Sequence, residues 1–188
     1  MGMFVWIALV AVGVYAVILY NGLVNIKEAV AKAWANIDVL LKQRHDELPK
    51  LVDTCKEYMK HEQVTLEKVM LARSRVSSAR ESHNVAALGS AEAAMKTGLG
   101  GLFAVAESYP ELKSNEQFLN LQARISGLEN AIADRREFYN DSVNINNVGI
   151  AQFPSVLLAR LFNFKAHELL KFTPDELKDV DIGQRFGA

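Results

Sequence analysis

The chain has 188 residues and a mass of 20.9 kDa, which favours one domain with room for a short appendage. Half of its residues are apolar and 23% are charged, so global disorder, collagen-like repeats and low complexity are excluded. The net charge of −1 offers no broad basic surface for nucleic acid. A single cysteine excludes an internal disulfide and a cysteine-based zinc site.

The N-terminal segment is apolar, and the first charged side chain is Lys27. From Met3 to Val24 a helix would be roughly 33 Å long, at about 1.5 Å per residue. The hydrocarbon core of a bilayer is about 30 Å thick, so residues 1–24 are expected to form a transmembrane anchor. Trp6 and Tyr20 suit its two aromatic belts. A cleaved signal peptide and a buried core helix are the alternatives.

Positive charges near the expected span lie on its C-terminal side, beginning with Lys27 and Lys32. The positive-inside rule places such a flank in the cytoplasm. We therefore expect a single-pass protein with a short N-terminus outside and the chain from about Asn21 onward in the cytoplasm. The basic cluster of Lys42, Arg44, His45 and Lys50 is short and fits anionic lipid better than nucleic acid.

Apolar residues after the span follow alternating spacings of four and three, typical of a helix packed along partner helices. This seam, similar to that of a coiled coil, consists of Val30, Trp34, Ile37, Leu41, Arg44, Leu48, Leu51, Cys55 and Tyr58. The span and this seam are expected to form one continuous helix. Pro49 predicts a kink between Arg44 and Pro49, with a break at that point as the alternative.

Two further helical segments are expected. The first runs from about residue 62 to 107, and His83 and Asn84 mark a loop or a frayed turn within it. Four glycines in its second half (Gly89, Gly98, Gly100 and Gly101) lower helix stability by up to about 1 kcal/mol each. The second begins after a cap at Ser114–Asn115, is roughly 36 residues long, and stops at Phe153–Pro154.

These segments predict an all-α fold: three long antiparallel helices plus a short C-terminal helix, with no sheet. The bundle is expected to cover residues 25–165. Its last part, residues 155–165, either packs on the base of the bundle or lies on the membrane surface. Residues 166–188 are expected to form a polar tail or a short helix, since Thr173–Glu176 has the pattern of a helix start.

An ordered set of residues covering 20 to about 165 resembles the LemA family of bacteria. The set comprises Tyr20-Asn21, Trp34, Ile37-Asp38, Arg44, Leu48-Pro49, Leu51-Val52, Ala106-Glu107-Ser108-Tyr109-Pro110-Glu111-Leu112, Phe118, Leu121, Glu129-Asn130, Ile132-Ala133, Arg135-Arg136, Tyr139-Asn140, Val143, Asn144, Asn147 and Phe153-Pro154. The resemblance implies a membrane helix with a short outer end, a long antiparallel bundle and no assigned enzymatic activity. It also implies a bacterial cytoplasmic membrane, and some relatives are associated with specialised bacterial membranes.

Arg44 and Arg135 occupy seam positions where apolar residues are expected. A buried charge needs a partner, and Glu107 and Glu129 are the candidates, so we expect ion pairs between helices that fix their register. Ligand or peptide recognition and simple solvent exposure are the alternatives for these arginines.

Asn140, Asn144 and Asn147 form an amide stripe near the end of the last long helix, with Asn146 beside it. We expect these amides to bond between helices, near Asn21 and Asn25. A polar subunit interface or a small-ligand site is the alternative.

Catalytic and metal-binding patterns are not found. A di-iron bundle requires Glu-x-x-His pairs, and none of the four histidines has a glutamate three residues before it. No phosphate loop or His-Glu-x-x-His motif is present. Cys55, at a seam position, is interpreted as inert core and not as a nucleophile. We therefore expect no enzymatic activity, no cofactor and no metal.

The pattern as a whole predicts a membrane-anchored, self-associating helical scaffold of the bacterial cytoplasmic membrane, which organises or shapes that membrane. Its expected partners are the lipid bilayer, further copies of itself and other membrane or cytoplasmic proteins, but not nucleic acid. The first alternative is a signal relay or adaptor that binds a cytoplasmic protein. The second is an enzyme with an unrecognised site.

Overall fold

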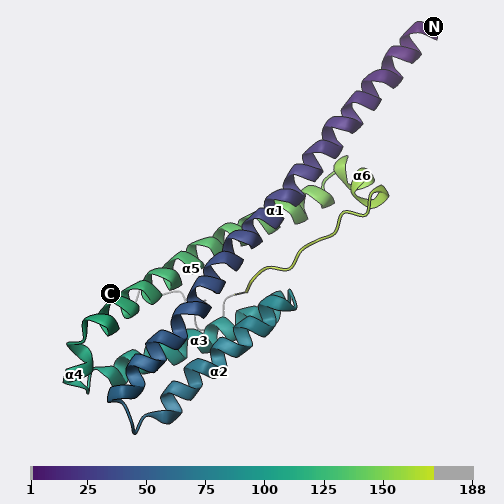
Figure 1. Cartoon of the computed structure of the whole chain (residues 1–188). Helices are drawn as coiled ribbons and strands as arrows, with labels where there is room; N and C mark the ends of the chain where they lie inside the picture. The colour runs from purple at the N-terminus through teal and green to yellow at the C-terminus, as the bar shows by residue number, and fades with distance from the viewer. Residues whose placement is uncertain (1, 172–188) are drawn as a thin grey trace, which may run out of the picture. The chain divides into compact units, whose positions relative to one another are not determined.

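The computed structural model describes residues 2–171, and all regular structure in that stretch is α-helical (Figure 1). The helices are α1 (Gly2–Tyr58), α2 (Gln63–Glu81), α3 (Val85–Ala106), α4 (Pro110–Lys113), α5 (Glu116–Ala151) and α6 (Ser155–Leu161). Over the described residues, the expected all-α fold is confirmed.

The chain divides into two units, each assembled from segments that are far apart in the sequence. Among the described residues, the first unit is 2–37 with Asp134–Leu169, and the second unit is Asp38–Ala133 with 170–171. Both α1 and α5 contribute residues to each unit. These bounds differ from the expected division at residues 24 and 165. Contacts between distant helices define the units, whereas the expected bounds followed the change from apolar to polar composition.

α1 is a single helix of 57 residues that continues through Pro49. The alternative of a break at this proline is therefore wrong. Proline removes one backbone hydrogen bond from a helix, but packing of neighbouring side chains can hold the helix together. Leu48 and Leu51, on either side of Pro49, are 1% and 0% exposed, so the helix is fixed by its contacts on both sides of the proline.

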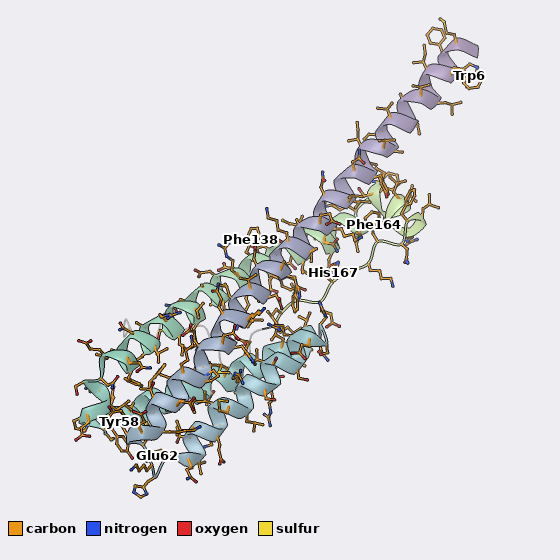
Figure 2. All side chains as sticks on the ribbon, in the orientation of Figure 1. Trp6, Tyr58, Glu62, Phe138, Phe164 and His167 are labelled. Carbon is orange, nitrogen blue, oxygen red and sulfur yellow. The ribbon has the colours of Figure 1, made fainter. Side chains whose placement is uncertain are left out.

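The N-terminal part of α1 is apolar and exposed. It contains an 18-residue window with a mean hydropathy of 2.5, none of which is buried. Trp6, labelled in Figure 2, is 71% exposed. A core helix of a soluble protein would bury such a stretch, so the alternative of a buried core helix is wrong. By length and composition α1 is able to cross a membrane, and a signal sequence has the same properties.

α2 and α3 form a helical pair in the second unit and lie side by side (Figure 1). The turn between them has His83 at a positive φ of 51°, and the side chain of Asn84 then caps α3 by accepting a 2.8 Å bond from Ala87 N. The loop expected at His83 and Asn84 is therefore present, and it makes two helices of the middle segment. Gly98 lies against Val69 of α2, and the glycine-rich stretch remains helical.

α5 has 36 residues and ends at Ala151, close to the expected stop at Phe153–Pro154. Asn115 caps its N-terminus, because its side-chain oxygen accepts a 3.0 Å bond from Phe118 N. α6 follows after a short turn. Residues 164–171 then run without helix, and the expected helix start at Thr173–Glu176 lies outside the described residues.

Candidate functional site

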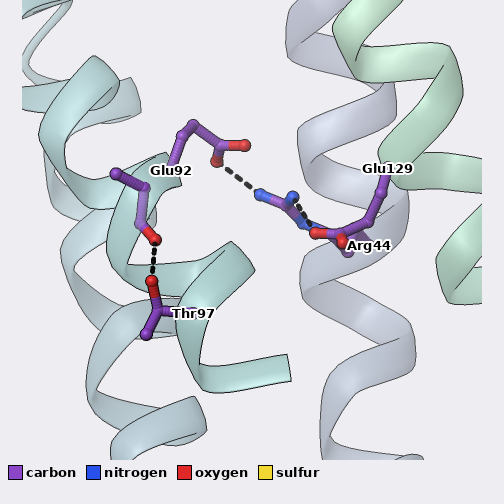
Figure 3. Close-up of polar contacts among 5 residues, drawn as sticks. Arg44, Glu92, Thr97 and Glu129 are labelled. Atoms are coloured by element: carbon purple, nitrogen blue, oxygen red, sulfur yellow. Dashed lines mark hydrogen bonds and ion pairs between the residues drawn. The ribbon is translucent and has the colours of Figure 1, made fainter. Parts of the chain in front are cut away.

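A buried arginine joins three helices of the second unit. Arg44 of α1 is 2% exposed and donates through Nη2 to Glu92 of α3 and through Nη1 to Glu129 of α5, the latter at 3.2 Å (Figure 3). These three residues are called the Arg44 cluster below. Each carboxylate comes from a different helix, so the guanidinium fixes the register of α1 against both α3 and α5.

The two carboxylates of the Arg44 cluster differ in exposure: the side chain of Glu92 is 4% exposed and that of Glu129 is 26% exposed. Burial raises the pKa of Glu129, the positive charge of Arg44 lowers it, and Glu92 raises it again. Arg44 is therefore the group that keeps two neighbouring carboxylates together in a largely buried place. The geometry supports a structural role, because a buried charge of this kind is tolerated only when it is paired.

Three further polar contacts attach α1 to its neighbours in the second unit. Arg124 of α5 donates to Glu47 at 2.6 Å, and Arg80 of α2 lies 3.5 Å from Asp38. Arg73 of α2 donates through Nε to the backbone oxygen of His45 at 2.9 Å and contacts its ring Nε2 at 2.6 Å.

The contact between Arg73 and the His45 ring fixes the protonation of that ring. Arginine can only donate, so Nε2 of His45 must accept and carry no proton. Burial and then the charge of Arg73 lower the pKa of His45, while Asp46 opposes this. The folded chain therefore favours a neutral His45.

The structure brings together two of the four residues expected to form ion pairs. Arg44 and Glu129 are in contact, whereas Glu107 and Arg135 are exposed. The expectation that Arg135 points inward is therefore wrong, and its neighbour Arg136 is the buried arginine, at 8% exposure. A strict alternation of three and four residues falls behind the 3.6-residue period of a straight helix, so the buried face moves on by one residue after Ile132.

Glu92 was missed by the sequence reasoning, although a signal was present. The buried residues of α3 include Leu88, Glu92, Met95, Leu99, Leu102 and Ala106, with spacings of four, three, four, three and four. Glu92 therefore occupies a seam position in a helix rich in alanine and glycine. The sequence pattern was assigned to Ala91, which is also buried, and so Glu92, the residue that pairs with Arg44, was overlooked.

Two asparagines of α5, Asn146 and Asn147, form hydrogen bonds to backbone groups in the first unit. Asn146 is 1% exposed and donates to Lys165 O at 3.1 Å. Asn147 donates to His167 O and accepts from His167 N, both at 2.9 Å. These two side chains, called the amide clamp below, hold the extended segment that follows α6.

The predicted amide stripe differs from this arrangement. Asn144 is exposed, Asn140 is half-buried, and the buried member is Asn146. The partners of the amide clamp are backbone groups of residues 165–167, and not the expected Asn21 and Asn25. Spacing alone could not identify them, because an extended segment has no helical period to align with the stripe.

Aromatic rings complete the first unit. Trp34 of α1 packs edge-on against Tyr139 of α5, with ring centroids 5.6 Å apart. The hydroxyl of Tyr139 donates to Glu168 O at 3.0 Å, so it holds the same extended segment as the amide clamp. The ring of Tyr20 of α1 packs edge-on against those of Phe162 and Phe164, with ring centroids 4.8 and 5.9 Å apart. Rings at these distances and angles pack favourably.

Cys55 is fully buried, and burial raises its pKa to about 12. Its thiol therefore stays protonated near neutral pH and is a poor nucleophile. Among residues 2–171, no group of three or more histidines, cysteines or carboxylates is arranged to hold a metal ion.

Comparison with known proteins gives three related matches of similar strength. The chain is 33% identical over 88 residues to "Magnetosome protein MamQ 2" and to "Magnetosome protein MamQ 1" of Paramagnetospirillum magneticum (strain ATCC 700264 / AMB-1). It is 32% identical over 88 residues to "Magnetosome protein MamQ" of Magnetospirillum gryphiswaldense (strain DSM 6361 / JCM 21280 / NBRC 15271 / MSR-1). Each match covers 47% of this chain and 32% of the relative, so the chain spans about a third of their length.

The LemA family matches residues 33–183, which is most of the chain and includes the Arg44 cluster and the amide clamp. With the exposed apolar helix at the N-terminus, this match indicates a membrane-associated helical protein. The chain belongs to the LemA family.

Proposed function

We propose that this protein is a membrane-anchored, self-associating helical scaffold of the bacterial cytoplasmic membrane. The observation that carries the proposal is the continuity of α1, whose exposed apolar N-terminal part and packed C-terminal part form a single helix. Positive charges from Lys27 onward favour a cytoplasmic position for the rest of the chain. The role requires no catalytic step.

The Arg44 cluster supports a mechanical role for the second unit. One guanidinium binds carboxylates from two other helices, so sliding any of the three helices separates a buried pair of charges. Leaving such a charge unpaired costs about 3–5 kcal/mol, a large part of the stability of a small domain. A scaffold needs helices that hold their register, and this cluster provides that resistance.

Self-association is supported by an exposed apolar face on α5. Phe138 (marked in Figure 2), Ile145 and Val148 are 52%, 59% and 52% exposed, and their spacing of seven and three places them on one side of the helix. Copies anchored in one membrane meet side by side and with the same polarity, which raises their effective concentration. A second copy is therefore the proposed occupant of this face.

The matched relatives, which are named as magnetosome proteins, support a role in a specialised bacterial compartment.

Membrane anchoring is tested with the full chain produced in bacteria. We expect it to remain in the membrane pellet after an alkaline carbonate wash, because a helix buried in the bilayer resists extraction. Release into the supernatant, or a mature chain that begins after Tyr20, would show that the apolar segment is no permanent anchor.

Self-association is tested by measuring the mass of the detergent-purified chain by light scattering. We expect a discrete homo-oligomer that Phe138→Asp and Ile145→Asp convert to smaller species. Val64→Asp is the matched control, since Val64 is 65% exposed but lies on α2. A wild-type monomer, or equal effects of all three substitutions, would contradict assembly through α5.

A signal relay or adaptor is the second candidate, and a groove between α2 and α3 favours it. Its lining includes small residues of α3 and basic residues of α2: Ala93, Ala94, Gly98, Gly101, Lys68 and Arg75. Such a groove suits an apolar helix with acidic flanks. A monomeric chain that binds a model peptide of this kind, and no longer binds it after Gly101→Leu, would favour the adaptor, because an added Cβ at Gly101 meets no other atom.

A further inference from the structure

The short helix α6 and the residues on either side of it carry an exposed apolar surface. Phe153, Leu157, Leu161 and Phe162 are 81%, 60%, 74% and 53% exposed, while Ala159 on the inner side is 3% exposed. Leu157 and Leu161 are four residues apart and so lie on one face of the helix. Four large apolar side chains within ten residues are therefore more than half exposed in the described structure.

The position of α6 in the first unit is set by the end of the apolar part of α1. Phe162 and Phe164 pack on Tyr20, which ends the run of apolar residues in the sequence (Figure 2 labels Phe164). A tyrosine at such a place is typical of a membrane–water interface. A bilayer that holds residues 3–20 of α1 would therefore have its boundary at the level of α6.

α6 is held at both of its ends. Before it, Gly149 of α5 approaches Ile26 so closely that an added Cβ would lie 3.3 Å from Ile26 Cδ1. After it, the amide clamp fixes Lys165 and His167, the latter labelled in Figure 2. The exposed face of α6 is therefore presented in a fixed place.

The charged side chains between Asp141 and Glu168, the stretch that contains α6, are of one sign. Arg160 and Lys165 are exposed, and the sequence from Ser142 to His167 contains no aspartate or glutamate. Apolar residues accompanied by basic side chains are typical of helices that lie in the interface of a membrane containing anionic lipid. A second copy of the chain would cover the apolar residues, but it would not explain the exclusion of acidic ones.

We propose that α6, together with Phe153, is a second membrane contact, which lies in the headgroup region of the same bilayer that α1 crosses. Phe153, Leu157, Leu161 and Phe162 enter the boundary of the acyl chains, and Arg160 and Lys165 face lipid phosphates. This inference rests on the membrane anchoring proposed above, and it adds a lipid-binding surface on the bundle side of the anchor.

The test uses the full chain in vesicles of phosphatidylcholine and phosphatidylglycerol that carry a spin-labelled acyl chain. An environment-sensitive fluorophore is attached to Leu161→Cys, and Asn144→Cys, an exposed position on α5, is the matched control. The unsubstituted chain serves as the blank, since Cys55 is buried. Trp6 emission in Trp34→Phe, measured with brominated lipid, reports independently whether α1 is inserted.

We expect the fluorophore at position 161 to shift to the blue and lose most of its emission to the lipid quencher, while that at position 144 does neither. Quenching is also expected to weaken when phosphatidylglycerol is omitted or when Arg160→Gln and Lys165→Gln are combined. Trp6 is expected to be quenched throughout.

Other outcomes overturn the inference. If Trp6 is quenched and the fluorophore at position 161 is not, α1 is inserted in the membrane but α6 does not contact it. If neither is quenched, the anchor of the proposed function has failed as well. A blue shift at position 161 that disappears on dilution with excess lipid would mean that a second copy covers α6. A blue shift without lipid quenching would mean that protein covers it.

Discussion

The two units of the protein are held by different chemistry. In the second unit, a buried guanidinium binds two carboxylates, and part-buried ion pairs such as that between Arg124 and Glu47 join further helices. In the first unit, neutral amides and aromatic rings provide the described contacts between segments. Charge pairs depend on both partners being present, whereas an amide that binds backbone depends on one side chain. The second unit should therefore be far more sensitive to single substitutions.

The largest effect is expected for Arg44→Met. It leaves the carboxylates of Glu92 and Glu129 close together without their cation, and the expected loss of unfolding free energy is about 3 kcal/mol. The measurement is chemical unfolding followed by circular dichroism. Arg135→Met is the matched control, since Arg135 is exposed and should change stability by less than about 0.5 kcal/mol.

Equal effects of Arg44→Met and Arg135→Met would show that the Arg44 cluster contributes no stability. A further variant sharpens the comparison. Replacing all three members of the cluster with apolar residues of similar volume should recover much of the loss, because no unpaired charge remains.

A smaller effect is expected in the first unit for Asn147→Ala. The substitution removes two hydrogen bonds to the backbone of His167, but His167 is exposed and water can replace them, so the expected loss is about 1 kcal/mol. Hydrogen exchange of the His167 amide should accelerate. Asn144→Ala, an exposed asparagine on the same helix, is the control. Unchanged exchange at His167 in Asn147→Ala would contradict the amide clamp.

The pH dependence of stability should be a property of the second unit, through His45. Its folded-state pKa is lowered, so the unfolded chain binds a proton first as the pH falls below about 6.5. The stabilisation from the neutral ring is present above that pH and is lost as the pH falls towards the folded-state pKa. The midpoint temperature of thermal unfolding should therefore decrease as the pH is lowered from about 7 to about 5.

His45→Gln should reduce this fall in the midpoint, because the glutamine side chain does not titrate. His61→Gln, at an exposed position after α1, is the comparison. If both variants show the wild-type pH dependence, the contact between Arg73 and His45 has no role in it.

The smallest effect is expected at Cys55. With its pKa raised to about 12 and its side chain buried, the native thiol should not react with a maleimide near neutral pH. Glu57→Cys introduces an exposed thiol two residues away and should react at once. Rapid modification of the native wild-type chain would show that this part of α1 opens.

Much of the fold could be predicted from the sequence, because packed long helices require apolar residues at regular spacings. The extents of α1 and α5, the cap at Asn115 and the turn at His83 and Asn84 all follow from spacing and local chemistry. The division into two units could not be predicted, since it depends on contacts between residues that are distant in the sequence.

The candidate sites were harder to predict, for two physical reasons. The seam rule gave Arg44 but chose Arg135 in place of Arg136, because the 3.6-residue period drifts over a long helix. The asparagine stripe was visible, but its partner is the backbone of residues 165–167. Backbone groups are the same for nearly every amino acid, so the sequence does not identify them as partners. Glu92 was visible in principle, as a charged residue at a regular spacing in a weakly polar helix.

The amide clamp has a consequence for how the sequence can change over time. Asn146 and Asn147 recognise carbonyl and amide groups that almost every amino acid carries, and the side chains of Lys165, Ala166 and His167 are exposed. The clamp itself should thus tolerate most substitutions at these three positions, with proline at position 167 excluded because it lacks the donated N–H. In contrast, few substitutions of the two asparagines should preserve these hydrogen bonds.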